Sequence, residues 1–162
     1  MPDRPVVLNN TPLVALWALG RLDLLRDLFG EVLIPEAVEA EFLAGDPARR
    51  EALRNAPWVR KIALAHPRRA LVYIGLDYGE SEVLALADEM EARLVVIDER
   101  KARRYAERLG LPLTGTLGLL LLAKESGLLD SVADGIARLR EAGLFLSPAL
   151  VQRTLEIAGE SS

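Results

Sequence analysis

The sequence of 162 residues contains no cysteine and a single histidine, His66. Without cysteine, disulfide bonds, zinc–thiolate sites and cysteine nucleophiles are excluded. A serine–histidine triad would depend on His66, which lies in a loop-like AHPRR segment, and no GxSxG motif is present. We therefore expect His66 to be an exposed loop residue. Any catalysis must depend on carboxylates, hydroxyls, lysines or a hard metal ion.

Long apolar runs are also missing. The longest, residues 117–123, is followed by Lys124 and Glu125 and is far shorter than the roughly 20 residues that cross a bilayer. The N-terminal segment MPDRPVVLNN lacks the basic start, long apolar stretch and small-residue cleavage site of a signal peptide. These two absences predict a cytoplasmic protein.

A surplus of basic residues is absent as well, because 24 acidic residues outnumber 20 lysines and arginines. The net charge of −4 is unlike that of most nucleic-acid-binding proteins. A local acidic cluster that holds a metal is still compatible with arginines elsewhere that contact phosphate. Apolar residues make up 51% of the chain, which predicts one folded domain over residues 1–158 and a flexible tail at 159–162.

Strand and helix patterns alternate along the chain with short linkers. This alternation predicts a doubly wound α/β fold with a mainly parallel sheet. The expected strands are 6–8, 32–34, 94–97 and 113, with 58–64 as an edge strand or extended segment. The expected helices are 13–19 with Thr11 as N-cap, 22–29, 35–43, 48–54, 80–91, 99–109, 117–126, 129–142 and 148–158. Ligands bind such sheets at the carboxyl ends of strands. The polar residues that follow strands are Asn9, Asn10, Asp98, Thr114 and Thr116.

Acidic residues stand at two strand-to-helix transitions. Asp98 and Glu99 follow the apolar strand LVVI, and taken alone they favour a helix N-cap over a site at the rim of the sheet. Glu80 and Glu82 open another helix, and their spacing of two allows only one of them to face a site. Gly79 precedes them and has no side chain, so another group can approach closely there.

The helix in IPEAVEAEFL carries three more acids, which individually indicate a solvated face. Considered together, however, the acids at helix starts and strand ends would converge on one rim of the sheet. Hard divalent cations bind through one or two carboxylates, waters and substrate phosphates, and two ions about 4 Å apart can promote phosphoryl transfer. This chemistry needs neither histidine nor cysteine.

Five segments in this order resemble the PIN-domain family, close to its prokaryotic VapC-like toxins. They are VVLNNTPLVALWALGRLDLL, VLIPEAVEAEFL, LDYGESEVLALA, LVVIDERKARRYAERLGL and TGTLGLLLLAKESGLL, and the C-terminal LREAGLFLSPALVQRTLEIAGE is similar too. The resemblance implies a PIN-like (Rossmann-like) three-layer α/β/α fold with a mainly parallel central sheet. It also implies a metal-dependent endoribonuclease whose acids hold one or two Mg²⁺ or Mn²⁺ ions.

The resemblance assigns roles residue by residue. The implied catalytic residues are Glu41, Glu80 and Asp98, and the implied metal ligands are Asn9, Glu80, Asp98 and Glu99. Asn9 lies in NNTPL, where the family usually has aspartate. An asparagine can coordinate through its carbonyl oxygen but brings no charge, so a weaker metal site is expected. The alternative is a non-catalytic PIN-like module that binds RNA or protein.

Substrate contacts are expected on the helix that follows Asp98, whose basic run would hold RNA phosphates near the metal. A solvated helix face paired with nearby glutamates is the alternative. The expected substrate-binding residues are Asn10, Thr116, Arg100, Lys101 and Arg104.

The resemblance also implies protein partners: a homodimer, and a small antitoxin that lays an amphipathic segment into an apolar groove. The leucine-rich helices of residues 13–28 and Trp17 are candidates for that apolar surface, although burial in the core is the default expectation for them. A phosphatase is disfavoured, because the chain has no DxD nucleophile motif and no phosphate-binding glycine loop.

Overall fold

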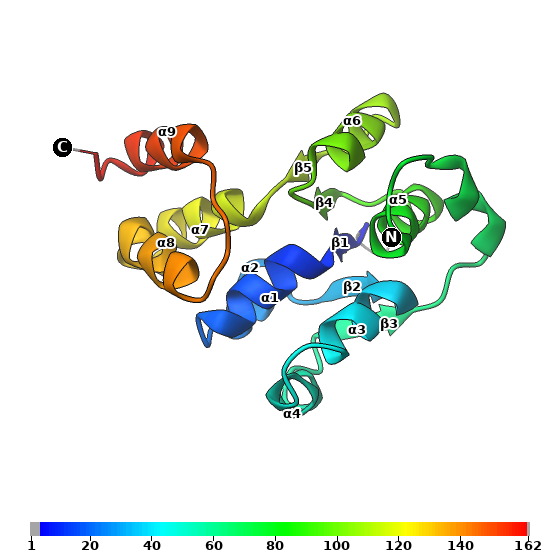
Figure 1. Ribbon diagram of the computed structural model, residues 1–162, viewed down its shortest axis with the longest axis horizontal. Helices are drawn as coiled ribbons and strands as arrows, with labels where there is room; N and C mark the ends of the chain where they lie inside the picture. Colours follow the sequence, from blue (N-terminus) through cyan, green and yellow to red (C-terminus); the bar gives the residue numbers. More distant parts are fainter. Residues whose placement is uncertain (1–3, 162) are drawn as a thin grey trace.

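Five short parallel strands form the centre of the protein, which a computed structural model describes over residues 4–161 (Figure 1). The strands are β1 (Val6–Leu8), β2 (Val32–Pro35), β3 (Val59–Ile62), β4 (Leu94–Val96) and β5 (Leu113–Thr114). Their order in the sheet is β3-β2-β1-β4-β5, and Val7 of β1 pairs with Leu33 on one side and Val95 on the other. The predicted α/β fold with a parallel sheet is confirmed, and the edge strand expected near residues 58–64 is β3.

Helices cover both faces of this sheet. They are α1 (Asn10–Ala18), α2 (Asp23–Phe29), α3 (Glu36–Leu43), α4 (Ala48–Arg54), α5 (Tyr78–Glu89), α6 (Arg100–Arg108), α7 (Thr116–Glu125), α8 (Val132–Glu141) and α9 (Pro148–Ala158), with a 3₁₀ helix η1 (Pro67–Val72) that was not predicted. Helices α5 and α6 lie on one side of the strands, and α2 and α7 lie on the other (Figure 1). Helix α3 packs between α1 and α5, and α8 and α9 pack against α7.

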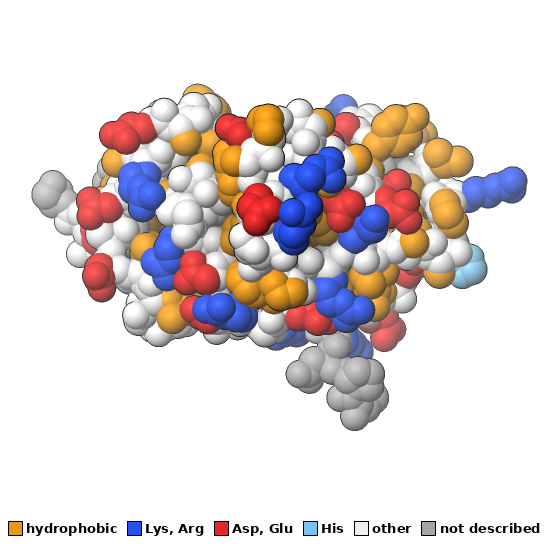
Figure 2. Space-filling model, turned by 90° about the horizontal axis from the view of Figure 1, so that it is seen from below, with side chains coloured by type: hydrophobic (Ala, Val, Ile, Leu, Met, Phe, Trp, Pro, Cys, Tyr) orange, Lys and Arg blue, Asp and Glu red, His pale blue; other side chains and the backbone are white. Residues whose placement is uncertain are grey.

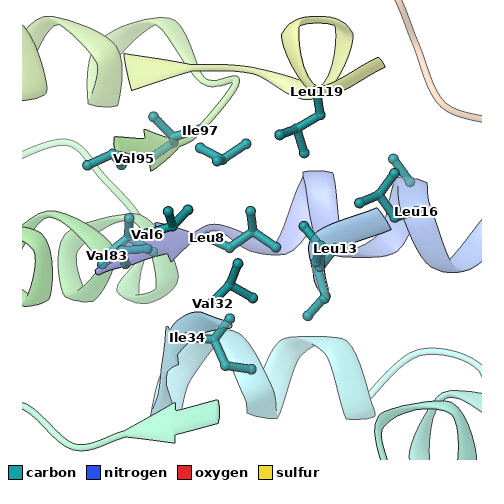
Figure 3. Packing of buried hydrophobic residues seen from close by; sticks show 14 of the residues in the cluster. Val6, Leu8, Leu13, Leu16, Val32, Ile34, Val83, Val95, Ile97 and Leu119 are labelled. Carbon is teal, nitrogen blue, oxygen red and sulfur yellow. The ribbon is translucent and has the colours of Figure 1, made fainter. Parts of the chain in front are cut away.

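The core is almost entirely aliphatic. Every residue of β1 is fully buried, as expected for a strand that is covered on both faces. Figure 3 shows Leu13 of α1 and Leu119 of α7 at different levels beyond the end of β1, while Val83 of α5 lies beside Val6. This packing fixes the carboxyl ends of β1 and β4, where the polar residues begin.

The leucines of residues 13–28 belong to this core, as the default expectation for them had it, and do not supply a surface groove. Leu13, Leu16 and Leu24 are fully buried. Trp17 is half-buried, with its ring edge against Phe42 and the Arg49 guanidinium 4.8 Å from its centroid. The apolar pattern of α1 and α2 therefore reflects packing, so the expected burial in the core is confirmed for these leucines and the alternative of an exposed docking face is not.

Helix α1 begins earlier than predicted. Asn9, rather than Thr11, is the N-cap, so Pro12 is the third helical residue. Proline is tolerated there because the first N–H groups of a helix have no intrahelical acceptor. The Asn9 N–H donates to Val96 O at 3.0 Å, which extends the pairing of β1 and β4 by one residue. Its side chain makes no capping hydrogen bond, so its amide remains available at the end of the strand.

The C-terminal segment is tied to the helices before it by Glu160, which falls in the segment expected to be a tail. Its carboxylate accepts hydrogen bonds from Lys124 Nζ at 2.7 Å and from the N–H groups of Val132 and Ala133 at 2.9 Å. The ammonium of Lys124 is the main cause that lowers the pKa of Glu160 from 4.5 to about 2. Glu160 thus caps the start of α8 and links it to α7.

Glu160→Gln should lower the free energy of unfolding at pH 7 by about 1–2 kcal/mol, because the charged acceptor of these hydrogen bonds is lost. The folded pKa is depressed, so the stabilisation is fully present above the unfolded pKa near 4.5 and is lost as the pH falls towards about 2. Urea unfolding at pH 7, 5 and 3.5 should show the difference between variant and wild type shrinking with acidity. Glu141→Gln, at an exposed position of α8, is the matched control.

Candidate functional site

Asn9 and Asp98 lie at the point where the strand order reverses. Strands β1 and β4 are neighbours, and the chain fills the sheet outward from β1 on one side and from β4 on the other. In open parallel sheets the crevice at the carboxyl ends of two such strands is the usual ligand site. Asn9 directly follows β1, and Asp98 follows β4 after Ile97. The sheet therefore brings together two of the predicted site residues.

The Asp98 carboxylate is oriented by α7. Its Oδ1 accepts a hydrogen bond from the Thr116 N–H at 2.8 Å, and its Oδ2 accepts one from the Thr116 hydroxyl at 2.7 Å. The N-cap of α6 is Glu99, whose side chain accepts from the Ala102 N–H at 2.8 Å. The interpretation of Asp98 as the cap of α6 is therefore wrong. Each oxygen of Asp98 accepts one bond here and retains a lone pair for a further partner.

Thr116 was expected to contact substrate, but its side chain faces the protein. The residue is 1% exposed, and its hydroxyl is directed at Asp98. This geometry makes Thr116 a positioning residue for the carboxylate.

Gly115 is a requirement of this site that sequence reasoning missed. A Cβ at Gly115 would lie 2.5 Å from Oδ1 of Asp98 and 3.1 Å from Nη1 of Arg103. The backbone φ of −123° suits any residue, so contact rather than conformation demands glycine. Gly115 in the TGT segment precedes an expected helix, just as Gly79 does. The reasoning applied to Gly79 would therefore have identified Gly115 as well.

Glu41 reaches the start of α5 because Gly79 has no side chain. A Cβ at Gly79 would overlap Oε1 of Glu41, so the close approach predicted for this glycine is confirmed, and the approaching group is a carboxylate. Burial raises the pKa of Glu41, and the neighbouring charges of Asp77 and Glu80 raise it further.

Glu80 and Glu82 have different partners. Asp77 and Glu80 form a capping box, in which Asp77 Oδ1 accepts from the Glu80 N–H at 2.8 Å and Glu80 Oε1 accepts from the Asp77 N–H at 3.1 Å. Burial raises the pKa of Glu80, and the charges of Asp77 and Glu99 add to this. Glu82 instead accepts from the Ala37 N–H at 3.1 Å and completes the first turn of α3. Glu80 is therefore the member of the pair that belongs to the acidic group.

Five acids lie at this rim, and we call them the rim carboxylates: Glu41, Asp77, Glu80, Asp98 and Glu99. The charges of Asp77 and Glu80 act on Glu41, and those of Asp77 and Glu99 act on Glu80. Across residues 4–161 none of them forms a salt bridge. Within the same range, no three carboxylate or histidine side chains lie close enough together to hold one metal ion. Because Mg²⁺ uses one or two carboxylates and completes its shell with water, an ion bound here would take at most two of these side chains.

Two asparagines add neutral oxygens to this rim. Asn9 is 6% exposed, and its side chain makes no capping hydrogen bond. Oδ1 of Asn10 is buried without a hydrogen-bond partner in the described part of the chain. Amide oxygens in need of a donor or a cation fit the donor set that Mg²⁺ or Mn²⁺ prefers.

The basic run after Asp98 is not paired with glutamates. Arg100, Lys101 and Arg104 are exposed on α6, and no salt bridge to them exists between residues 4 and 161. The exposure of this helix face agrees with the solvated alternative, but the pairing with glutamates that the alternative expected is absent from the described residues. Arg103 turns inward and donates to Ile97 O at 3.1 Å, and Lys101 lies against Gly75.

A family model described as a PIN domain (DUF3368) matches residues 5–160. No curated protein matches the chain. None of the helices between residues 4 and 161 is both long enough and apolar enough to span a bilayer.

Proposed function

The chain belongs to the PIN-domain family, and from this premise we propose that it is a metal-dependent endoribonuclease that hydrolyses RNA phosphodiesters. The observation that carries the proposal is the group of rim carboxylates, none of which forms a salt bridge with a lysine or arginine in the described chain. Proteins seldom concentrate unpaired charge of one sign without a ligand, because mutual repulsion lowers stability. A divalent cation would offset this repulsion.

Asn9 and Asp98, together with one of Glu80 and Glu99, are the residues that would hold Mg²⁺ or Mn²⁺, with water completing its shell. Such an ion lowers the pKa of bound water and neutralises charge on the phosphate. Thr116 holds the Asp98 carboxylate in one orientation, so little rearrangement is needed on binding. Glu41 lies against the start of α5 at the same rim, where its carboxylate would accept hydrogen bonds from water.

The second candidate is a non-catalytic PIN-like module that binds RNA or protein. The observation that favours it is Asn9, which removes one negative charge from the carboxyl end of β1. The two candidates are separated by incubating the protein with a mixed RNA pool and Mn²⁺, with and without a chelator. Cleavage that the chelator abolishes supports the nuclease, and an inert protein supports the module.

We also propose that the protein is the toxin of a toxin–antitoxin pair, forms a homodimer and is held inactive by a small antitoxin. An apolar surface beside the rim supports a protein partner, since Ile74 is 80% and Tyr78 82% exposed. Figure 2 shows hydrophobic side chains gathered at the end of the molecule that carries the pale-blue histidine. Acidic and basic side chains are interspersed on the face that Figure 2 shows, so this face has no broad basic patch to which RNA would bind. Molar mass by light scattering tests the dimer.

Gly115→Ala should lower the cleavage rate about tenfold, because the added methyl group displaces the Asp98 carboxylate from the N–H and hydroxyl of Thr116. Initial rates with Mn²⁺ measure the effect, and thermal unfolding reports how much stability the lost hydrogen bonds contribute. Gly135→Ala in α8 is the control, since its Cβ would meet Leu120 only at an ordinary 3.5 Å. Equal rates for the two variants would show that the position of Asp98 is unimportant.

A further inference from the structure

A groove of about 930 Å³ leads away from Asp98 between α6, α7 and α9. Figure 1 shows α6 and α9 on the same edge of the molecule, with the link from β5 to α7 between them. The groove has aliphatic side chains along its length, two from α7 and two from α9: Leu117, Leu121, Leu150 and Ile157. Leu150 and Ile157 are more than half exposed, so they present apolar surface to an occupant of the groove.

Arginines dominate the charged side chains of this groove. Arg100, Arg103 and Arg104 come from α6 and Arg153 from α9, against only two acids, Asp98 and Glu107. The lining is therefore net positive in a chain whose overall charge is −4. The exposed arginines 100, 104 and 153 form no salt bridge with any residue that the structure describes. Like charges around one groove repel, and an anionic occupant relieves that repulsion.

We propose that this groove binds the strand of single-stranded RNA that extends from the cleavage site, with α9 as its second wall. The inference rests on the proposed function, because it takes Asp98 as the point where the scissile phosphate sits. Guanidinium groups bind phosphate oxygens in bidentate fashion, and the groove carries arginines from both α6 and α9. Arg153, which no sequence pattern singled out, becomes a substrate-binding residue.

The aliphatic side chains of the groove favour single-stranded RNA over an RNA duplex. Unpaired bases can turn towards Leu121, Leu150 and Ile157 while the backbone faces the arginines, whereas a duplex keeps its bases stacked inside. No aromatic side chain lines the groove, so the bases have no stacking platform, and sequence preference should be weak. An acidic amphipathic protein segment would match the same surface, but it would not account for the continuity of the groove with Asp98.

The test is fluorescence anisotropy with a labelled single-stranded RNA of 12 nucleotides, in EDTA so that no cleavage occurs. Arg153→Glu should raise the dissociation constant about tenfold. Arg140→Glu on α8 makes the same charge change at an exposed position outside the groove, and should change it less than about twofold. Ile157→Ser should weaken binding about threefold, and an RNA duplex of equal length should bind more weakly than the single strand. Thermal unfolding confirms that each variant is folded.

Failure of the groove and failure of the nuclease give different results. Equal dissociation constants for Arg153→Glu and Arg140→Glu, tight duplex binding, or no RNA binding at all would overturn the groove; the last would leave the protein segment as its occupant. If wild type cleaves RNA with Mn²⁺, and Arg153→Glu binds and cleaves RNA as well as wild type does, the nuclease proposal is supported and the groove proposal is wrong. If RNA binding depends on Arg153 and no cleavage occurs, the groove proposal is supported and the nuclease proposal is wrong.

Discussion

Asp98→Asn should lower the rate of Mn²⁺-dependent RNA cleavage by at least about 100-fold while the protein remains folded. Asparagine has nearly the same shape, and its amide can still accept from the Thr116 N–H and donate to the Thr116 hydroxyl. What the substitution removes is the negative charge at the carboxyl end of β4. The rate change therefore reports the charge and not a collapse of the site.

Single-turnover cleavage rates and thermal unfolding should be measured on the same preparations. Asp130→Asn removes one carboxylate at an exposed position before α8 and serves as the control for the change in net charge. Cleavage by Asp98→Asn at the rate of this control would rule out Asp98 as a catalytic residue. A large loss of thermal stability in Asp98→Asn would instead assign the residue to the anchoring of α7.

The elements that the sequence predicted best are those whose cause is local. The β-branched run Val6–Leu8 and the segments Ala48–Arg54 and Pro148–Ala158 have the bounds expected for them. The start of α1 was misplaced because asparagine, serine, threonine and aspartate are all good N-caps, and NNTP contains three candidates in a row. Which of the three is the N-cap depends on where β1 ends in the sheet, and the pairing of the strands determines that end.

The contacts between residues of the site could not be predicted from the sequence either, because they also depend on tertiary structure. Asp98 and Thr116 are 18 residues apart, and they meet because Val96 of β4 pairs with Thr114 of β5. Gly79 indicated that some group approaches closely, but only the packing of α3 against α5 identifies that group as Glu41. Local patterns therefore locate the positions of a site, and strand register and helix packing decide which of them touch.

Asn9→Asp should have opposite effects on the metal-free and metal-bound protein. Without metal, a carboxylate at this buried position joins the unpaired rim carboxylates, so the melting temperature should fall by several degrees. With Mn²⁺, the new negative ligand should tighten metal binding and raise the cleavage rate about tenfold. Thermal unfolding across a Mn²⁺ titration measures both effects, because a ligand that binds only the folded state stabilises it in proportion to its affinity.

Asn55→Asp, at an exposed position after α4, adds the same charge away from the rim and should respond to Mn²⁺ as wild type does. A larger Mn²⁺-induced stabilisation in Asn9→Asp than in this control places residue 9 at the metal. If the rate rises as well, the wild-type chain is a nuclease whose metal site is weakened by its first-strand asparagine. If the metal tightens but wild type and variant are both inert, the rim binds a cation without catalysis, and the non-catalytic module is the correct function. If neither the Mn²⁺-induced stabilisation nor the cleavage rate changes in Asn9→Asp, then Asn9 is not part of the metal site.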